Sequence, residues 1–104
     1  MPDSQRHAFD ECDEDIARLY LKTASDQLNK MRVAVRSKSR AQVQRLAHSL
    51  LGASAMLGLV GIAKLLRELE QAASGDHFIE AARFMGLLKG EFVHVRRQCG
   101  LRFP

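Results

Sequence analysis

The sequence has 104 residues, of which 46% are hydrophobic and 27% charged, with a formal net charge of +4. This length fits one domain, and this hydrophobic content excludes a wholly disordered chain. The chain has only six aromatic residues, which disfavours a β-sandwich or barrel. Its two prolines lie at positions 2 and 104, so none interrupts a helix in the interior of the chain.

Two amphipathic helices are predicted in the first half of the chain, because apolar residues recur there at helical spacing. The first starts at Asp13 and ends at a break over residues 37–39. Ser39 is the expected N-cap of the second, which Gly58 and Gly61 end. The expected apolar stripes are Ile16, Leu19, Tyr20, Ala24, Leu28, Met31 and Val35, then Val43, Leu46, Ala47, Leu50, Ser54 and Leu57.

Two further helices are predicted in the second half. The third stops at residues 74–75, and Asp76 is the expected N-cap of the fourth, which Gly100 closes. Their stripes are Ile62, Leu65, Leu66, Leu69, Ala72 and Ala73, then Phe78, Ala82, Met85, Leu88, Phe92, Val95 and Cys99. Short loops between four such helices predict an all-α fold, an antiparallel up-down four-helix bundle over residues 13–99. Residues 1–12 form an N-terminal segment that can add a short helix, and residues 100–104 form a C-terminal tail.

Charge is distributed unevenly along the chain. Residues 1–26 hold seven acids against three bases, whereas residues 27–67 hold eight bases and no acid. The resulting positive field favours phosphate groups, an acidic protein surface or nucleic acid as a ligand. A basic helical module that binds nucleic acid is the remote alternative, because this stretch has no aromatic residue for stacking and no helix-turn-helix signature.

Motifs of metal sites, common enzymes and membrane segments are missing from the sequence. Cys12 and Cys99 form no CxxC pair, and the four histidines have no metal-ligand or triad spacing. Neither a signal peptide pattern nor a long apolar run is present. We therefore expect a cytoplasmic protein with free thiols, no metal of its own, no membrane contact and no independent catalytic activity.

The second predicted helix carries an unusual pair of residues on its outward face. On a helical wheel, His48 lies about 140° and Gly52 about 180° from Val43, the reference of the apolar stripe. Glycine in a helix interior lowers the stability of the helix by about 1 kcal/mol relative to alanine. On a face that packs against nothing within the protein, no packing contact offsets this loss. A bare backbone beside an exposed imidazole lets another molecule approach closely, although a surface histidine without function is about as good an interpretation.

The run from Ala47 to Gly58 resembles the signature of histidine-containing phosphotransfer (HPt) domains, roughly A-H-x-L-K-G-x-S-x-x-x-G. The similarity continues through Ile62, Leu65, Leu66 and the pair Leu69-Glu70, and covers about residues 13–99. The resemblance implies a phosphorelay carrier in which His48 accepts a phosphoryl group from a receiver-domain aspartyl phosphate and passes it to another receiver. The receivers would belong to response regulators or hybrid histidine kinases and would supply Mg²⁺, and we expect the carrier to be a monomer.

One position departs from the family pattern, since Leu51 stands where relatives usually have a lysine that holds the phosphoryl oxygens. Arg45, Lys64 or Arg67 can supply the charge instead. The alternative is an adaptor that docks a receiver or kinase without efficient phosphotransfer. Some relatives carry glutamine at the position of Glu70 to bond the imidazole, and a carboxylate there would hold the ring's proton. The expected phosphate environment or docking surface comprises Arg45, Ser49, Leu51, Gly52, Ala55, Lys64, Arg67 and Glu70.

Overall fold

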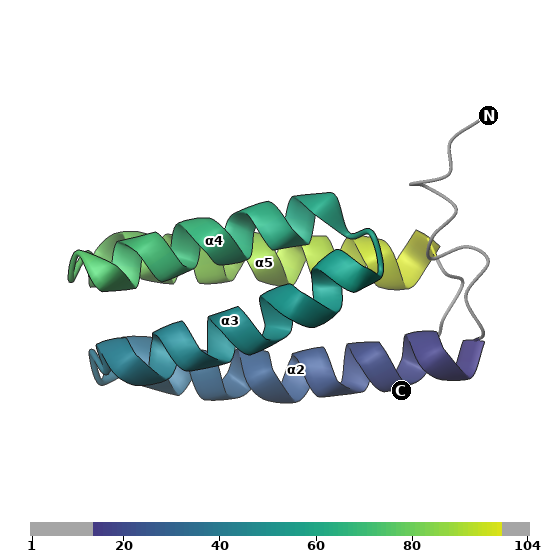
Figure 1. Ribbon diagram of the computed structural model, residues 1–104, viewed down its shortest axis with the longest axis horizontal. Coiled ribbons are helices and arrows are strands. Elements are labelled where there is room, and N and C mark those ends of the chain that lie inside the picture. Colours follow the sequence, from purple (N-terminus) through teal and green to yellow (C-terminus); the bar gives the residue numbers. More distant parts are fainter. Residues whose placement is uncertain (1–13, 99–104) are drawn as a thin grey trace.

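The computed structural model describes residues 14–98, which form four α-helices. Successive helices run in opposite directions, and each packs against its neighbours in the order α2, α3, α4, α5 and back to α2 (Figure 1). This arrangement confirms the predicted all-α four-helix bundle. The helices are α2 (Glu14–Arg36), α3 (Arg40–Met56), α4 (Val60–Ser74) and α5 (Phe78–Gln98).

Some expectations concern residues outside the described range 14–98. They are the leading helix within residues 1–12, the free thiols of Cys12 and Cys99, the closing role of Gly100 and the tail at 100–104. Within the described range, no helix combines the length and apolar character that crossing a membrane requires.

The three connections between helices share one hydrogen-bonding pattern. Lys38, Gly58 and Asp76 have positive φ values of 56°, 75° and 59° and follow the ends of α2, α3 and α4. The N–H of each donates to the carbonyl three residues back, and the next N–H donates to the carbonyl five residues back. This is the Schellman motif, which satisfies carbonyl groups that the end of a helix would leave unpaired.

These motifs correct two predictions about helix ends. Asp76 is not the N-cap of α5: it is the left-handed residue that ends α4, and His77 precedes α5 and accepts from the N–H of Ala81. Gly61 does not end α3, because it lies inside the first turn of α4. Ser39 does occupy the N-cap position of α3, although its side chain makes no capping hydrogen bond.

One apolar core fills the centre of the bundle and draws on all four helices. It differs from the predicted stripes at Ile16, Leu19 and Ala82, which are exposed, while neighbouring residues such as Leu21 and Ala81 are buried. The buried strips of α2 and α5 are therefore offset by one or two positions from the predicted stripes. The largest fully buried residues are Leu21, Met31, Val43, Leu50, Ser54, Ile62, Leu66, Leu69 and Leu88.

A buried polar link joins α2 to α3 within this core. The hydroxyl oxygens of Tyr20 and Ser54 lie 2.6 Å apart, and the Ser54 hydroxyl also donates to the carbonyl of Leu50 at 2.8 Å. A serine hydroxyl has one proton, so Tyr20 is the donor to Ser54. The Tyr20 ring packs against Phe92 of α5 with 6.1 Å between centroids. The inward side of α3 is therefore fixed to α2 by a satisfied hydrogen-bond pair.

Candidate functional site

His48 lies in the middle of α3 and projects away from the core. Its side chain is 77% exposed, whereas its neighbours Ala47 and Leu50 are fully buried. Burial of these neighbours, together with Val43 and Ser54, fixes the rotation of α3 about its axis. The exposure of His48 is thus a consequence of how the apolar stripe of α3 packs, as the helical wheel predicts.

The surface around His48 on α3 is open. Gly52, one turn after His48, is exposed, and a Cβ atom added there would meet nothing within 4 Å. Met56, one further turn along the same face, is 89% exposed. Sequence reasoning missed Met56, although its spacing of eight residues from His48 places it on the same side of the helix. A partner can therefore approach this face closely at Gly52 and find an apolar contact beside it.

Glu70 of α4 is the acidic residue that the structure brings to the imidazole. The Nδ1 atom of His48 lies 3.6 Å from Oε2 of Glu70, whose side chain is 28% exposed. This separation allows a Coulomb interaction and is slightly longer than a hydrogen bond. The Glu70 carboxylate therefore lies at the Nδ1 side of the ring, and Nε2 is the ring nitrogen on the side away from the carboxylate.

Leu51 is half buried and packs against the core, so the position of the family's usual lysine holds an apolar contact here. Helices α3 and α4 are antiparallel, and His48 lies opposite Glu70. In an antiparallel pair, moving forward along α3 corresponds to moving backward along α4. Leu51, about one turn after His48, therefore lies across from Arg67, about one turn before Glu70. The remaining expected site residues Arg45, Ser49, Ala55, Lys64 and Arg67 are all exposed.

The basic residues are not equally close to the histidine in this register. Lys64 lies a turn beyond Arg67 toward the loop, and Arg45 lies one turn before His48 on α3. Among the described residues, no three histidine, cysteine or acidic side chains converge as metal ligands would. The site therefore offers one exposed imidazole, one carboxylate and nearby cations.

A four-helix bundle that presents an exposed histidine beside a bare glycine, with a carboxylate of the next helix at the ring, has the architecture of a histidine phosphotransfer module. Residues 15–97 match the family described as the Hpt domain, and the chain belongs to this family. Hpt domains are phosphocarrier modules, not catalysts; they take part in histidine phosphotransfer in phosphorelays and interact with receiver domains of two-component systems. No curated protein and no solved structure is significantly similar to the chain.

Proposed function

We propose that this Hpt domain carries a phosphoryl group on His48, which it accepts from the aspartyl phosphate of one receiver domain and donates to another. The observation that carries the proposal is the exposed imidazole on α3, with open space at Gly52 and the Glu70 carboxylate at Nδ1. The receivers belong to response regulators or hybrid histidine kinases. They bring the acceptor aspartate and Mg²⁺, so this chain supplies the nucleophile and the docking surface.

The transfer needs only one nucleophilic nitrogen from this chain. The lone pair of Nε2 forms the N–P bond while the bond from phosphorus to the aspartyl oxygen breaks, and the carboxylate leaves with its electron pair. The proton on Nδ1 stays, so the product ring carries a positive charge beside the carboxylate of Glu70. Glu70 thus orients the ring with Nε2 outward and stabilises the charge that develops on it. Donation to the second receiver reverses these steps.

Arg67 is the residue best placed to replace the missing lysine. It lies opposite Leu51 in the register of α3 and α4, and one turn before Glu70 on α4. Its side chain is exposed and long enough to reach phosphoryl oxygens on His48. Arg67→Ala should therefore slow transfer more than Arg45→Ala or Lys64→Ala, and equal rates for the three variants would reject this assignment.

An adaptor that docks a receiver without efficient transfer is the second candidate. The observation in its favour is Leu51, which packs on the core and brings no charge to the phosphoryl group. The two functions differ in whether the chain becomes labelled, because both require the same exposed face for docking.

Phosphotransfer from a panel of receivers, each charged with ³²P-labelled phosphate, tests the proposal. The wild-type chain should acquire acid-labile, alkali-stable label, and His48→Ala should acquire none. His94→Ala is the matched control, since His94 is an exposed histidine on α5, and it should label normally. A receiver that binds the chain but transfers no phosphate, with wild type and His48→Ala indistinguishable, would instead establish the adaptor.

A further inference from the structure

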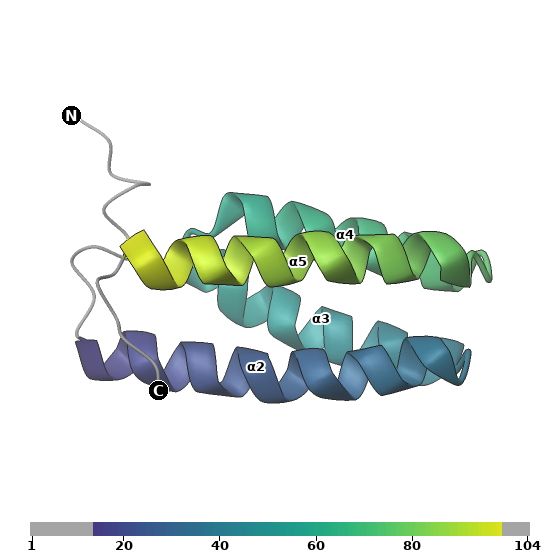
Figure 2. The ribbon, with the colours of Figure 1, turned by 180° about the vertical axis from the view of Figure 1, so that it is seen from behind.

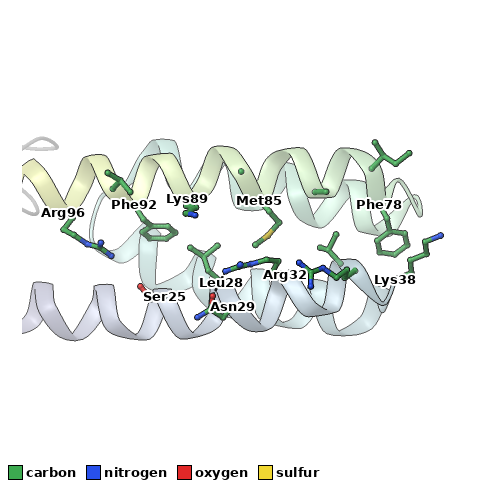
Figure 3. Close-up of a pocket in the computed structure, with 16 residues that line it drawn as sticks. Ser25, Leu28, Asn29, Arg32, Lys38, Phe78, Met85, Lys89, Phe92 and Arg96 are labelled. Atoms are coloured by element: carbon green, nitrogen blue, oxygen red, sulfur yellow. Dashed lines mark hydrogen bonds between the residues drawn. The ribbon is translucent and has the colours of Figure 1, made fainter. Parts of the chain in front are cut away.

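A groove of about 810 Å³ runs between α2 and α5, which pack together less closely than the other neighbouring helices (Figure 3). Its floor is apolar, and its lower and upper banks in the view of Figure 3 are α2 and α5. It lies on the face seen in Figure 2, whereas α3 and α4, which carry His48 and Glu70, form the near face in Figure 1. The residues of the floor are Leu28, Val35, Phe78, Met85 and Phe92.

The groove has cations on both sides and no carboxylate among its lining residues. Arg32 and Arg36 lie one turn apart on α2, Lys38 follows at the end of that helix, and Lys89 lines the groove from α5. All four side chains are exposed. An occupant with negative charges flanking an apolar ridge would complement both features.

Beside its cation, the α5 bank of the groove carries a strip of small and apolar residues. Gly86 lines the groove, and a Cβ atom added there would meet nothing within 4 Å. Ala82, one turn earlier, is exposed, and Ile79 and Val93 at the two ends of this strip are 89% and 37% exposed. Small side chains between apolar ends allow the backbone of another helix to come close, which is how helices pack at short distances.

We propose that the groove between α2 and α5 binds an amphipathic helix of a partner protein whose apolar ridge is flanked by glutamate or aspartate. From Ser25 to Arg36, the groove extends about 16 Å along α2, which corresponds to about three helical turns. The apolar ridge lies on the floor, and its flanking carboxylates pair with the cations of the two banks. This surface is separate from the proposed transfer site and can be occupied while a receiver engages His48.

Segments of this chain fit the groove less well than such a partner. Among the acids before Glu14, Asp10, Glu11 and Asp13 reach at most about 14 Å from it when fully extended, and Asp3, which reaches further, would bring only one carboxylate. The nearest groove residue on α2, Ser25, lies about 16 Å along the helix from Glu14. Residues 99–104 contain no acid, and a second copy placed groove to groove would oppose like charges.

Nucleic acid is the other class of ligand that a cationic groove attracts. Its bases need accessible aromatic faces to stack on, and Phe92 on the floor is only 4% exposed, while Phe78 is half buried. Apolar side chains arranged along a groove with a glycine on its bank match a helix better than a phosphate backbone.

A display library tests the proposal with defined probes. Its members are helices of about 14 residues with a fixed leucine ridge and flanking positions drawn from Glu, Gln and Lys, selected on the full chain at physiological salt. We expect retained helices to be rich in Glu at the flanks. A synthetic copy of a retained helix should bind at least tenfold more tightly than the same helix with Gln in place of every Glu.

Matched variants locate the binding surface. Gly86→Leu fills the α5 bank and Arg32→Glu reverses a cation, and each should weaken binding of the peptide at least tenfold. Gly90→Leu and Lys30→Glu are the controls, because both are exposed positions on the same helices outside the groove lining, and they should change affinity less than twofold. Leucine is a stronger helix former than glycine, so loss of binding in Gly86→Leu does not reflect unfolding, and circular dichroism checks this.

Several results would overturn the proposal. The proposal fails if the chain retains no helix from the library, or if retained helices carry Lys instead of Glu at the flanks. It also fails if Gly86→Leu and Gly90→Leu bind the peptide with equal affinity. Concentration-dependent self-association that Gly86→Leu abolishes would assign the groove to a second copy of the chain, and DNA binding that Gly86→Leu abolishes would assign it to nucleic acid. Either outcome also rejects the acidic helix.

Discussion

Tyr20 should ionise far above the ordinary range for tyrosine while the bundle is folded. Burial of the phenol raises the pKa of Tyr20 from 10.0 to about 12, and the hydrogen bond with Ser54 lowers it only in part. The chain contains one tyrosine and no tryptophan. Absorbance near 295 nm, where tyrosinate absorbs, therefore reports on this residue without interference from another tyrosine.

The difference between the pKa of Tyr20 in the folded state and its ordinary value makes the free energy of unfolding depend on pH. The folded state disfavours the ionised phenol, so the contribution of Tyr20 is fully present below pH 10 and is lost as pH rises from 10 through 12. A pKa raised from 10.0 to about 12 corresponds to roughly 3 kcal/mol of folding free energy once Tyr20 is ionised in both states, of which roughly half is lost by pH 11.

Comparison with Tyr20→Phe isolates this effect from the titration of lysines and arginines. At pH 8 the wild type should be more stable by about 1 kcal/mol, because the variant removes the hydrogen bond to Ser54. Urea denaturation at pH 8 to 11 should show this advantage disappear by pH 11. A spectroscopic midpoint near pH 10 in the folded protein, or a constant difference between the two proteins, would refute the reasoning.

Three further predictions concern the loops and the site. Lys38→Gly should raise the free energy of unfolding by about 1 kcal/mol in urea titrations, since glycine tolerates the positive φ of this residue, whereas Lys38→Ala should bring no gain. Glu70→Ala should slow labelling of His48 by about tenfold, corresponding to about 1.4 kcal/mol, and Glu70→Gln should lose less because its amide can still orient the ring; equal rates for both variants would contradict this role. Leu51→Lys should lengthen the lifetime of the labelled protein, because an ammonium group would then lie one turn from His48, and Leu51→Met should leave that lifetime unchanged.

The helices could be predicted from the sequence because their apolar periodicity is local, but some of their ends could not. Gly58 marks the end of α3 with the residue type that most readily adopts positive φ. Lys38 and Asp76 adopt the same backbone conformation in the same motif, and neither residue type signals it clearly. Asp76 instead resembles an N-cap, which explains the wrong prediction for the start of α5.

For the candidate site too, features set by one helix could be predicted from the sequence, whereas features set by the packing of two helices could not. The exposure of His48 and Gly52 follows from the orientation of a single helix, so a helical wheel suffices. The placement of Arg67 opposite Leu51 depends on how α3 and α4 pack. The groove between α2 and α5 joins residues forty or more positions apart in the chain, and no local pattern indicates it.

Exposed glycines on α3 and α5 lower helix stability at the two surfaces that are proposed to bind partners. Each helical glycine costs about 1 kcal/mol relative to alanine, and neither Gly52 nor Gly86 is needed for internal packing, since an added Cβ would meet no neighbour. Gly52 lies beside the exposed histidine and Gly86 lines the cationic groove, so at both positions the lost helix stability coincides with a surface where another chain can approach. Gly90 has equally open surroundings outside the groove lining, and nothing in the structure explains it. The core can stay intact while either face changes, because the buried stripes that orient α3 and α5 contain neither Gly52 nor Gly86.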